Sequence, residues 1–150
     1  MQRYDKFSIF VQQVLNPKTM QICILSSGGD CPGINATIRG VGKTAIMHYG
    51  MEVIGIHSGF VGLLNKDVQT FDERSLSGIL NLGGTILGTS REKPFRKLLA
   101  SGESEKPQLI RQNYEELGLD CLVCIGGNGT QKTAGMLLSL IHISEPTRPY

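Results

Sequence analysis

The sequence predicts an α/β fold in which helices cover both faces of a parallel sheet, giving three layers. Apolar runs of strand length recur along the chain and alternate with amphipathic helical repeats. Glycine-rich segments follow the strands: the chain has 19 glycines, and most gather in four clusters. A hydrophobic share of 40% and a net charge of only +2 exclude a disordered chain.

Three strands are expected because continuous apolar runs are typical of parallel strands that are buried on both faces. The runs cover residues 21–27, 51–57 and 119–125. The first run ends at the pair Gly28-Gly29, and the third ends at Gly126-Gly127. Both of these strands are therefore expected to lead directly into a glycine loop.

Helices are expected where apolar residues recur every three to four positions. These repeats predict longer helices at residues 34–50, 107–118 and 130–138, and shorter ones at 72–80 and 94–100. Gly50 and Gly118 stand at the ends of two longer helices, where glycine commonly terminates a helix. Either Asp72 or Ser75 is suited to cap the helix at 72–80.

The first and fourth glycine clusters are expected to bind an anion. Each follows a strand and precedes a helix, and ligands of parallel sheets bind at the carboxyl ends of the strands. Helix N-termini there present N–H groups, and glycine lets a phosphate approach the backbone closely. Tight turns without a ligand are the alternative for one such cluster, but two clusters of similar design favour phosphate.

Two common nucleotide motifs and two partner classes are excluded. Gly42-Lys43-Thr44 resembles the end of a P-loop, but it lies within an expected helix, and Thr37 stands where the motif requires glycine. The spacing G-x-G-x-x-G is absent from residues 28–33. Residues 20–138 hold 11 basic and 11 acidic residues, which does not favour a nucleic-acid partner. No apolar run reaches the roughly 20 residues that cross a membrane.

The cysteines favour a reducing compartment, and we expect a cytoplasmic protein. Cys121 and Cys124 have C-x-x-C spacing, but they lie in an apolar run that predicts a buried strand. Residues three apart on a strand point to opposite faces, so the two thiols cannot share a tetrahedral metal ion. Both are expected to be buried apolar residues, and Cys31 is expected to contribute packing.

Four segments, in this order, resemble the motifs of the 6-phosphofructokinase family of the ATP-dependent type. They read SGGDCPGINA at 27–36, GIHSGFVGL at 55–63, GGTILGTSR at 83–91 and IGGNGT at 125–130. The last segment alone leaves an NAD-kinase-like or lipid-kinase-like enzyme open, because those enzymes carry a similar sequence. The four together favour a phosphofructokinase-like fold, of which this chain would be a truncated N-terminal part.

This resemblance implies a kinase of glycolysis that transfers the γ-phosphate of ATP to the 1-hydroxyl of fructose 6-phosphate, with Mg²⁺ as cofactor. The full-length enzyme is expected to be a homo-oligomer. Phosphoryl transfer mainly requires positioning and neutralisation of the charge on the phosphate oxygens. Glycine loops and an arginine are residues that meet this requirement.

The family's nucleotide-binding positions correspond to Gly29, Arg91, Gly127, Asn128, Gly129 and Thr130. Arg91 is the catalytic residue that the resemblance implies, because its guanidinium can hold the transferring phosphoryl group. A solvated arginine is the alternative. Gly129 stands where diphosphate-using relatives carry aspartate, which favours ATP. Asn128 stands where most relatives carry an aspartate near Mg²⁺, and asparagine keeps an oxygen ligand without the charge.

The family-like sequence, the ATP-binding part, is expected to cover residues 20–138. Residues 1–19 are expected to be a non-native leader, and residues 139–150 an artefactual tail foreign to the family. The family's P-x-T-I-D-N-D motif, which carries the general-base aspartate, does not occur in the 150 residues. We therefore expect the chain alone to be a catalytically inactive fragment that at most binds nucleotide phosphates.

Overall fold

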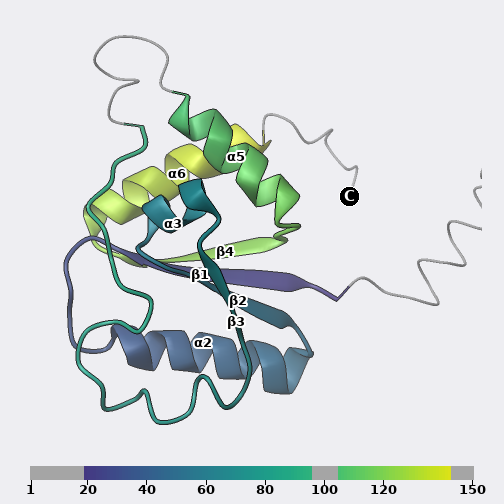
Figure 1. Cartoon of the computed structure of the whole chain (residues 1–150), viewed down its shortest axis with the longest axis vertical. Helices are drawn as coiled ribbons and strands as arrows, with labels where there is room; N and C mark the ends of the chain where they lie inside the picture. The colour runs from purple at the N-terminus through teal and green to yellow at the C-terminus, as the bar shows by residue number, and fades with distance from the viewer. Residues whose placement is uncertain (1–18, 96–104, 143–150) are drawn as a thin grey trace, which may run out of the picture.

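The computed structural model describes residues 19–95 and 105–142, which contain a four-stranded sheet. The strands are β1 (Gln21–Ser27), β2 (Glu52–Ile56), β3 (Val68–Phe71) and β4 (Cys121–Gly126). Their spatial order is β3-β2-β1-β4 (Figure 1). β1 pairs in parallel with β2 and β4, whereas β3 runs antiparallel to β2. The sheet is therefore mixed rather than parallel throughout as predicted, because the short edge strand β3 runs antiparallel to β2.

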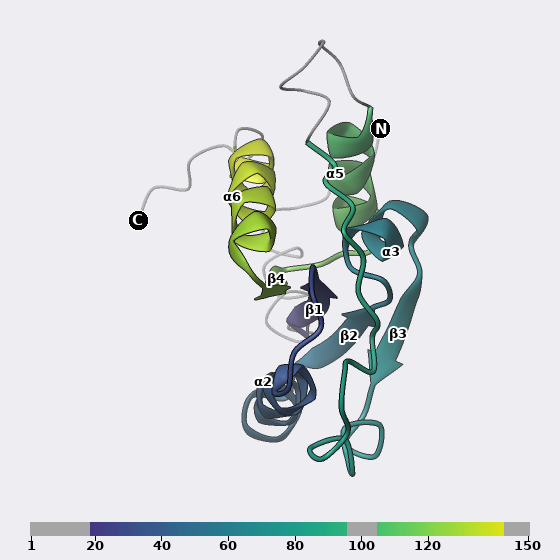
Figure 2. The ribbon, with the colours of Figure 1, turned by 90° about the vertical axis from the view of Figure 1, so that its left-hand side faces the viewer.

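Helices cover both faces of this sheet, as the sequence predicts. They are α2 (Ile34–Tyr49), α3 (Phe60–Asn65), α5 (Lys106–Glu116) and α6 (Asn128–His142). Figure 2 shows α2 on one face of the sheet and the other three helices on the opposite face. The three-layer α/β architecture is thus confirmed for the described residues.

The side chains of β1 alternate between two hydrophobic cores. Cys23 and Leu25 belong to the core on the side of α3, α5 and α6, where they join Phe60 and Ile110. Ile24 belongs to the other core, on the side of α2. Because β1 is buried on both faces, its four consecutive residues 22–25 are all apolar.

The three predicted strands and the three longer predicted helices are all present; β1 has the predicted bounds, and the others have shifted ends. The largest shift is in α6, which begins at Asn128 rather than at residue 130 and continues to His142 rather than ending at 138. The sequence does not predict β3 or α3, because segments of four and six residues are too short to show a clear period.

The predicted helix at residues 72–80 is wrong. The carboxylate of Asp72 accepts a hydrogen bond from the backbone N–H of Ser75 (2.7 Å), as a cap would. Hydrogen bonds from Ser75 also lower the pKa of Asp72. However, Gly78 has a φ of +76°, a left-handed conformation, so the chain leaves the turn at once. Most of the predicted helix at 94–100, residues 96–100, lies outside the described residues.

The P-loop-like residues 42–44 lie inside α2, as expected. Gly42 has a packing role there, because a Cβ at this position would lie 2.6 Å from Cδ1 of Leu76. Among the helices of the described ranges, none has both the length and the apolar composition needed to cross a membrane.

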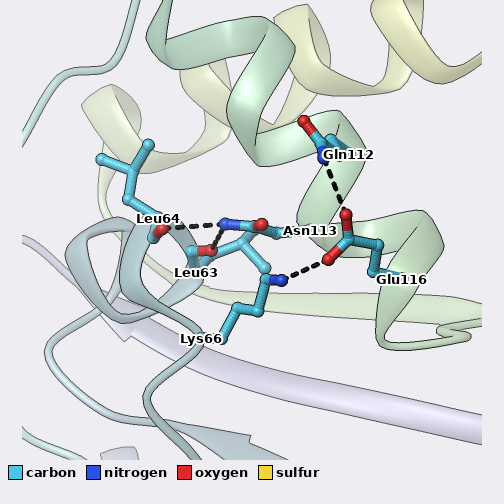
Figure 3. A network of polar contacts seen from close by, with 6 residues as sticks. All are labelled: Leu63, Leu64, Lys66, Gln112, Asn113 and Glu116. Atoms are coloured by element: carbon cyan, nitrogen blue, oxygen red, sulfur yellow. Dashed lines mark hydrogen bonds and ion pairs between the residues drawn. The ribbon is translucent and has the colours of Figure 1, made fainter.

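Asn113 of α5 connects this helix to the end of α3 (Figure 3). Its side-chain amide donates hydrogen bonds to the carbonyl oxygens of Leu63 (2.9 Å) and Leu64 (2.8 Å). The last carbonyls of a helix have no partner within the helix itself. Asn113 is only 2% exposed, so it satisfies these carbonyls where water has little access.

Replacing Asn113 by alanine is expected to lower the free energy of unfolding of the chain by about 2 kcal/mol, because two carbonyls lose their partner. Urea unfolding of both proteins measures the difference. Gln112→Ala is the matched control, since Gln112 is the exposed neighbour on the same helix and donates to Glu116 (2.7 Å). The control is expected to change stability far less, and equal losses would contradict the role of Asn113.

Candidate functional site

The first and fourth glycine clusters lie side by side. β1 and β4 are adjacent parallel strands, and their last residues, Ser27 and Gly126, are register partners. The loop that begins at Gly28 therefore leaves the sheet next to the N-terminus of α6 (Figure 1). This is the edge of the sheet at which the sequence predicts a ligand.

The segment that follows the third cluster crosses the same edge. Its Ser90 carbonyl oxygen accepts hydrogen bonds from the backbone N–H of Gly28 (2.9 Å) and from Oγ of Ser27 (3.0 Å). The hydroxyl of Thr89 donates to the carbonyl oxygen of Gly28. Arg91 follows directly, so its backbone is held beside the first glycine loop.

A cavity of about 670 Å³ lies between these segments, within the usual range for small-molecule sites. The predicted site residues that line it are Gly29, Arg91, Gly127, Gly129 and Thr130. Asn128 is exposed and does not belong to the lining. The fold therefore brings all the predicted site residues except Asn128 into one cavity.

Three of the lining glycines are not required by the fold. A Cβ added to Gly29, Gly127 or Gly129 would meet no described protein atom within 4 Å. None of the three has the positive φ that favours glycine. Their missing side chains leave space beside the backbone, which a phosphate group requires for close approach.

Gly126 and Thr130 have a different role, because they hold the two loops together. A Cβ on Gly126 would lie 2.4 Å from the carbonyl oxygen of Ser27, so only glycine allows this close approach. Thr130 is 5% exposed, and its hydroxyl donates to the same Ser27 oxygen (3.0 Å). The hydroxyl proton of Thr130 is thus used inside the protein, and Thr130 lies in the first turn of α6, where backbone N–H groups have no partner within the helix.

The charges around the cavity favour an anion. Arg91, Lys93 and Lys106 line it together with a single acidic residue, Glu92. Nζ of Lys106 lies 2.6 Å from Oε1 of Glu92. Together with the positive end of the α6 dipole, the cations give the cavity a positive potential. Sequence reasoning assigns no role to Lys106, because only the tertiary structure brings the start of α5 to this cavity.

The magnesium ion implied by the resemblance has no ready-made site in these residues. Within residues 19–95 and 105–142, no three His, Cys, Asp or Glu side chains come together closely enough to hold a metal ion. Asn128 offers one neutral amide oxygen, at the exposed start of α6. Mg²⁺ is usually held by one or two carboxylates and by substrate phosphates. These residues alone therefore do not fit a protein-built magnesium site.

None of the four cysteines lines this cavity. Burial, followed by the neighbouring Cys124, raises the pKa of Cys23 to about 12. Burial likewise raises the pKa of Cys124 to about 11, so both remain protonated thiols at neutral pH. The expected burial of Cys121 is wrong, because it begins an edge strand of the described sheet and is exposed. Cys31 is exposed too, which does not support a packing role.

Comparisons with known proteins agree on one family. The sequence profile of the family described as PFK, Phosphofructokinase, matches residues 21–144. The chain is 69% identical over 121 residues to ATP-dependent 6-phosphofructokinase 3 of Bacteroides thetaiotaomicron, covering 81% of this chain and 36% of the relative. It is 54% identical to ATP-dependent 6-phosphofructokinase of Spirochaeta thermophila, with coverage of 81% and 34%. The chain thus spans about a third of the length of these relatives.

Another relative differs in its phosphoryl donor. The chain is 42% identical to the pyrophosphate–fructose 6-phosphate 1-phosphotransferase of Dictyoglomus thermophilum, covering 81% of this chain and 33% of that protein. Among solved structures, phosphofructokinase from Saccharomyces cerevisiae matches with a TM-score of 0.73 and 33% identity, over 82% of this chain and 16% of that one. Sequence profile, relatives and fold agree, and the chain belongs to the phosphofructokinase family.

Proposed function

We propose that this chain forms the phosphoryl-donor side of an ATP-dependent 6-phosphofructokinase, which transfers the γ-phosphate of ATP to the 1-hydroxyl of fructose 6-phosphate. The observation that supports this proposal is a set of glycines with free space beside them, in the loops that follow the adjacent strands β1 and β4. Gly29, Gly127 and Gly129 line one cavity, although neither packing nor backbone conformation requires glycine there. A bound polyphosphate accounts for all three.

The proposed roles follow from the chemistry of phosphoryl transfer. Backbone N–H groups at Gly29 and in the first turn of α6 would bind the non-transferring phosphates. The guanidinium of Arg91 would donate two hydrogen bonds to the transferring phosphoryl group and stabilise its charge. Proton removal from the sugar hydroxyl is left to the family's general-base aspartate, which these residues do not contain.

Mg²⁺ would neutralise phosphate charge when it is bound with ATP. Because the described residues do not build a metal site, the proposal assigns the ion to the nucleotide, with Asn128 as a candidate neutral ligand. The homo-oligomeric state of the full-length enzyme and its cytoplasmic location stay predictions.

Activity assays require a complete subunit, which we define as residues 20–138 of this chain joined to the remaining sequence of the Bacteroides relative. ATP-dependent formation of fructose 1,6-bisphosphate by this subunit, followed in a coupled assay, tests the proposal. A subunit that is folded but uses diphosphate instead of ATP would contradict the assigned donor.

The donor preference is expected to depend on Gly129. In the complete subunit, Gly129→Asp should raise the KM for ATP by about 100-fold, because a carboxylate would face the nucleotide phosphates. Gly129→Asn is the matched control, since it has the same size without the charge and the site has room for a side chain. An unchanged KM in the aspartate variant would overturn the donor assignment.

The 150-residue chain by itself is expected to show no turnover with ATP and fructose 6-phosphate, since the general base is absent from it. The cavity residues are present, so weak binding of nucleotide phosphates is still expected and can be measured by titration calorimetry. Turnover above the uncatalysed rate would contradict the account of the missing base. The NAD-kinase-like and lipid-kinase-like alternatives explain only the last motif, whereas the family match runs over residues 21–144.

A further inference from the structure

The four glycine clusters of the sequence meet at one residue, Ser27. This serine is the last residue of β1, is 5% exposed and lines the cavity. It precedes the first cluster directly. The second cluster reaches it in the β2–α3 turn, the third through the segment that ends at Arg91, and the fourth at the start of α6.

Two of these approaches are so close that they require glycine. A Cβ on Gly59 would lie 2.8 Å from the carbonyl oxygen of Ser26 and 3.1 Å from Cβ of Ser27. A Cβ on Gly126 would lie 2.4 Å from the carbonyl oxygen of Ser27. The second and fourth clusters therefore pack directly on the backbone and side chain at the end of β1, and Ser27 has little freedom to move.

The third approach uses the hydroxyl of Ser27. Its Oγ donates a hydrogen bond to the carbonyl oxygen of Ser90 (3.0 Å), one residue before Arg91. The N–H of Gly28 donates to the same oxygen (2.9 Å). The hydroxyl of Ser90 is buried and has no hydrogen-bond partner among the described residues, so the anchor at this position is the Ser90 backbone.

We propose that Ser27 is a positioning residue, whose hydroxyl fixes the backbone before Arg91 and so places the guanidinium against the transferring phosphoryl group. This inference rests on the proposed function, because it concerns phosphoryl transfer at the same cavity. The turns of the second and fourth clusters hold Ser27 in place. Its hydrogen bond to the Ser90 carbonyl therefore fixes the backbone from which the long, exposed side chain of Arg91 extends. A misplacement of about 1 Å is enough to lower a rate by about 100-fold.

A double-mutant cycle on kcat in the complete subunit tests this role. Ser27→Ala is expected to lower kcat by about 10-fold and to leave the KM for fructose 6-phosphate unchanged. In the Arg91→Ala background, the same change is expected to have no further effect, because its consequence acts through Arg91. An equal loss of kcat in both backgrounds would overturn the proposal, since Ser27 would then act on the ligand or the fold directly.

Two further variants separate positioning from stability. Asn113→Ala is expected to lower stability without lowering kcat, so a loss of kcat in Ser27→Ala at similar stability cannot come from weakened folding. Ser27→Cys keeps nearly the same size with a weaker donor, and its kcat should lie between those of serine and alanine. A cysteine variant no better than alanine would count against the hydroxyl's role. Failure of the unmodified complete subunit to use ATP would contradict the proposed function instead.

Discussion

Replacing Arg91 by alanine in the complete subunit is expected to lower kcat for phosphoryl transfer by about 1,000-fold. The cavity holds three cations, but Lys106 pairs with Glu92, and Lys93 can offer a point charge without a fork. Arg91 is therefore the cation suited to hold two oxygens of the transferring group at once. The KM for ATP should change less than kcat, because the glycine loops bind the other phosphates in the ground state as well.

Arg91→Lys distinguishes charge from geometry. Lysine keeps the positive charge but loses the planar pair of donors, so its kcat is expected to lie well below wild type and above alanine. Arg111→Ala is the control: Arg111 lies on α5, outside the cavity lining, and pairs with Glu115 (3.0 Å). The Arg111→Ala variant should leave kcat and the KM for ATP unchanged. A kcat for Arg91→Ala within a few fold of wild type would show that this arginine is a solvated surface residue.

The largest effect on folding is expected from Gly62→Ala. A Cβ at Gly62 would lie 1.8 Å from the carbonyl oxygen of His57 and 2.8 Å from Cγ2 of Ile56. The first is a backbone atom, and the N–H of His57 is itself bonded to the carbonyl oxygen of Asp67 (3.0 Å), so the chain cannot move aside easily. We expect the free energy of unfolding to fall by about 3 kcal/mol, at the upper end for an added methyl group.

Gly40→Ala is the matched control for Gly62→Ala. Gly40 also lies in a helix, but a Cβ there would meet no described atom within 4 Å. Alanine is the better helix former, so this change should raise stability by about 0.5–1 kcal/mol. Urea unfolding of the two variants and the wild-type chain measures both effects. Losses of similar size would show that helix propensity, and not the contact with His57, determines the cost.

The sequence predicts the parts of the fold in which burial and period agree. A strand buried on both faces is rich in apolar residues, and the continuous apolar run at residues 22–25 identifies β1. The glycine loops can also be predicted from the sequence, because a ligand that approaches the backbone closely needs glycine there. The resemblance to the family points to Gly29, Gly127 and Gly129, and the structure places these three residues in one cavity.

The remaining elements depend on tertiary contacts that no local pattern carries. β3 is four residues long and forms through its antiparallel pairing with β2. Asn113 lies in a predicted helix, but its burial is explained only by the carbonyls at the end of α3. Lys106 reaches the cavity because α5 packs beside α3 and α6, and this cannot be read from residues 105–107.

The pairing of β1 with β4 links the formation of the cavity to folding. Thr130 and Ser27 are 103 residues apart in the chain, yet their hydrogen bond closes the wall of the cavity. A contact of such long range forms only after a large loss of chain entropy, so a partly folded chain lacks this cavity. Any polyphosphate that occupies the cavity therefore favours the state in which the two strands are joined, and by mass action it acts as a stabiliser of the whole sheet.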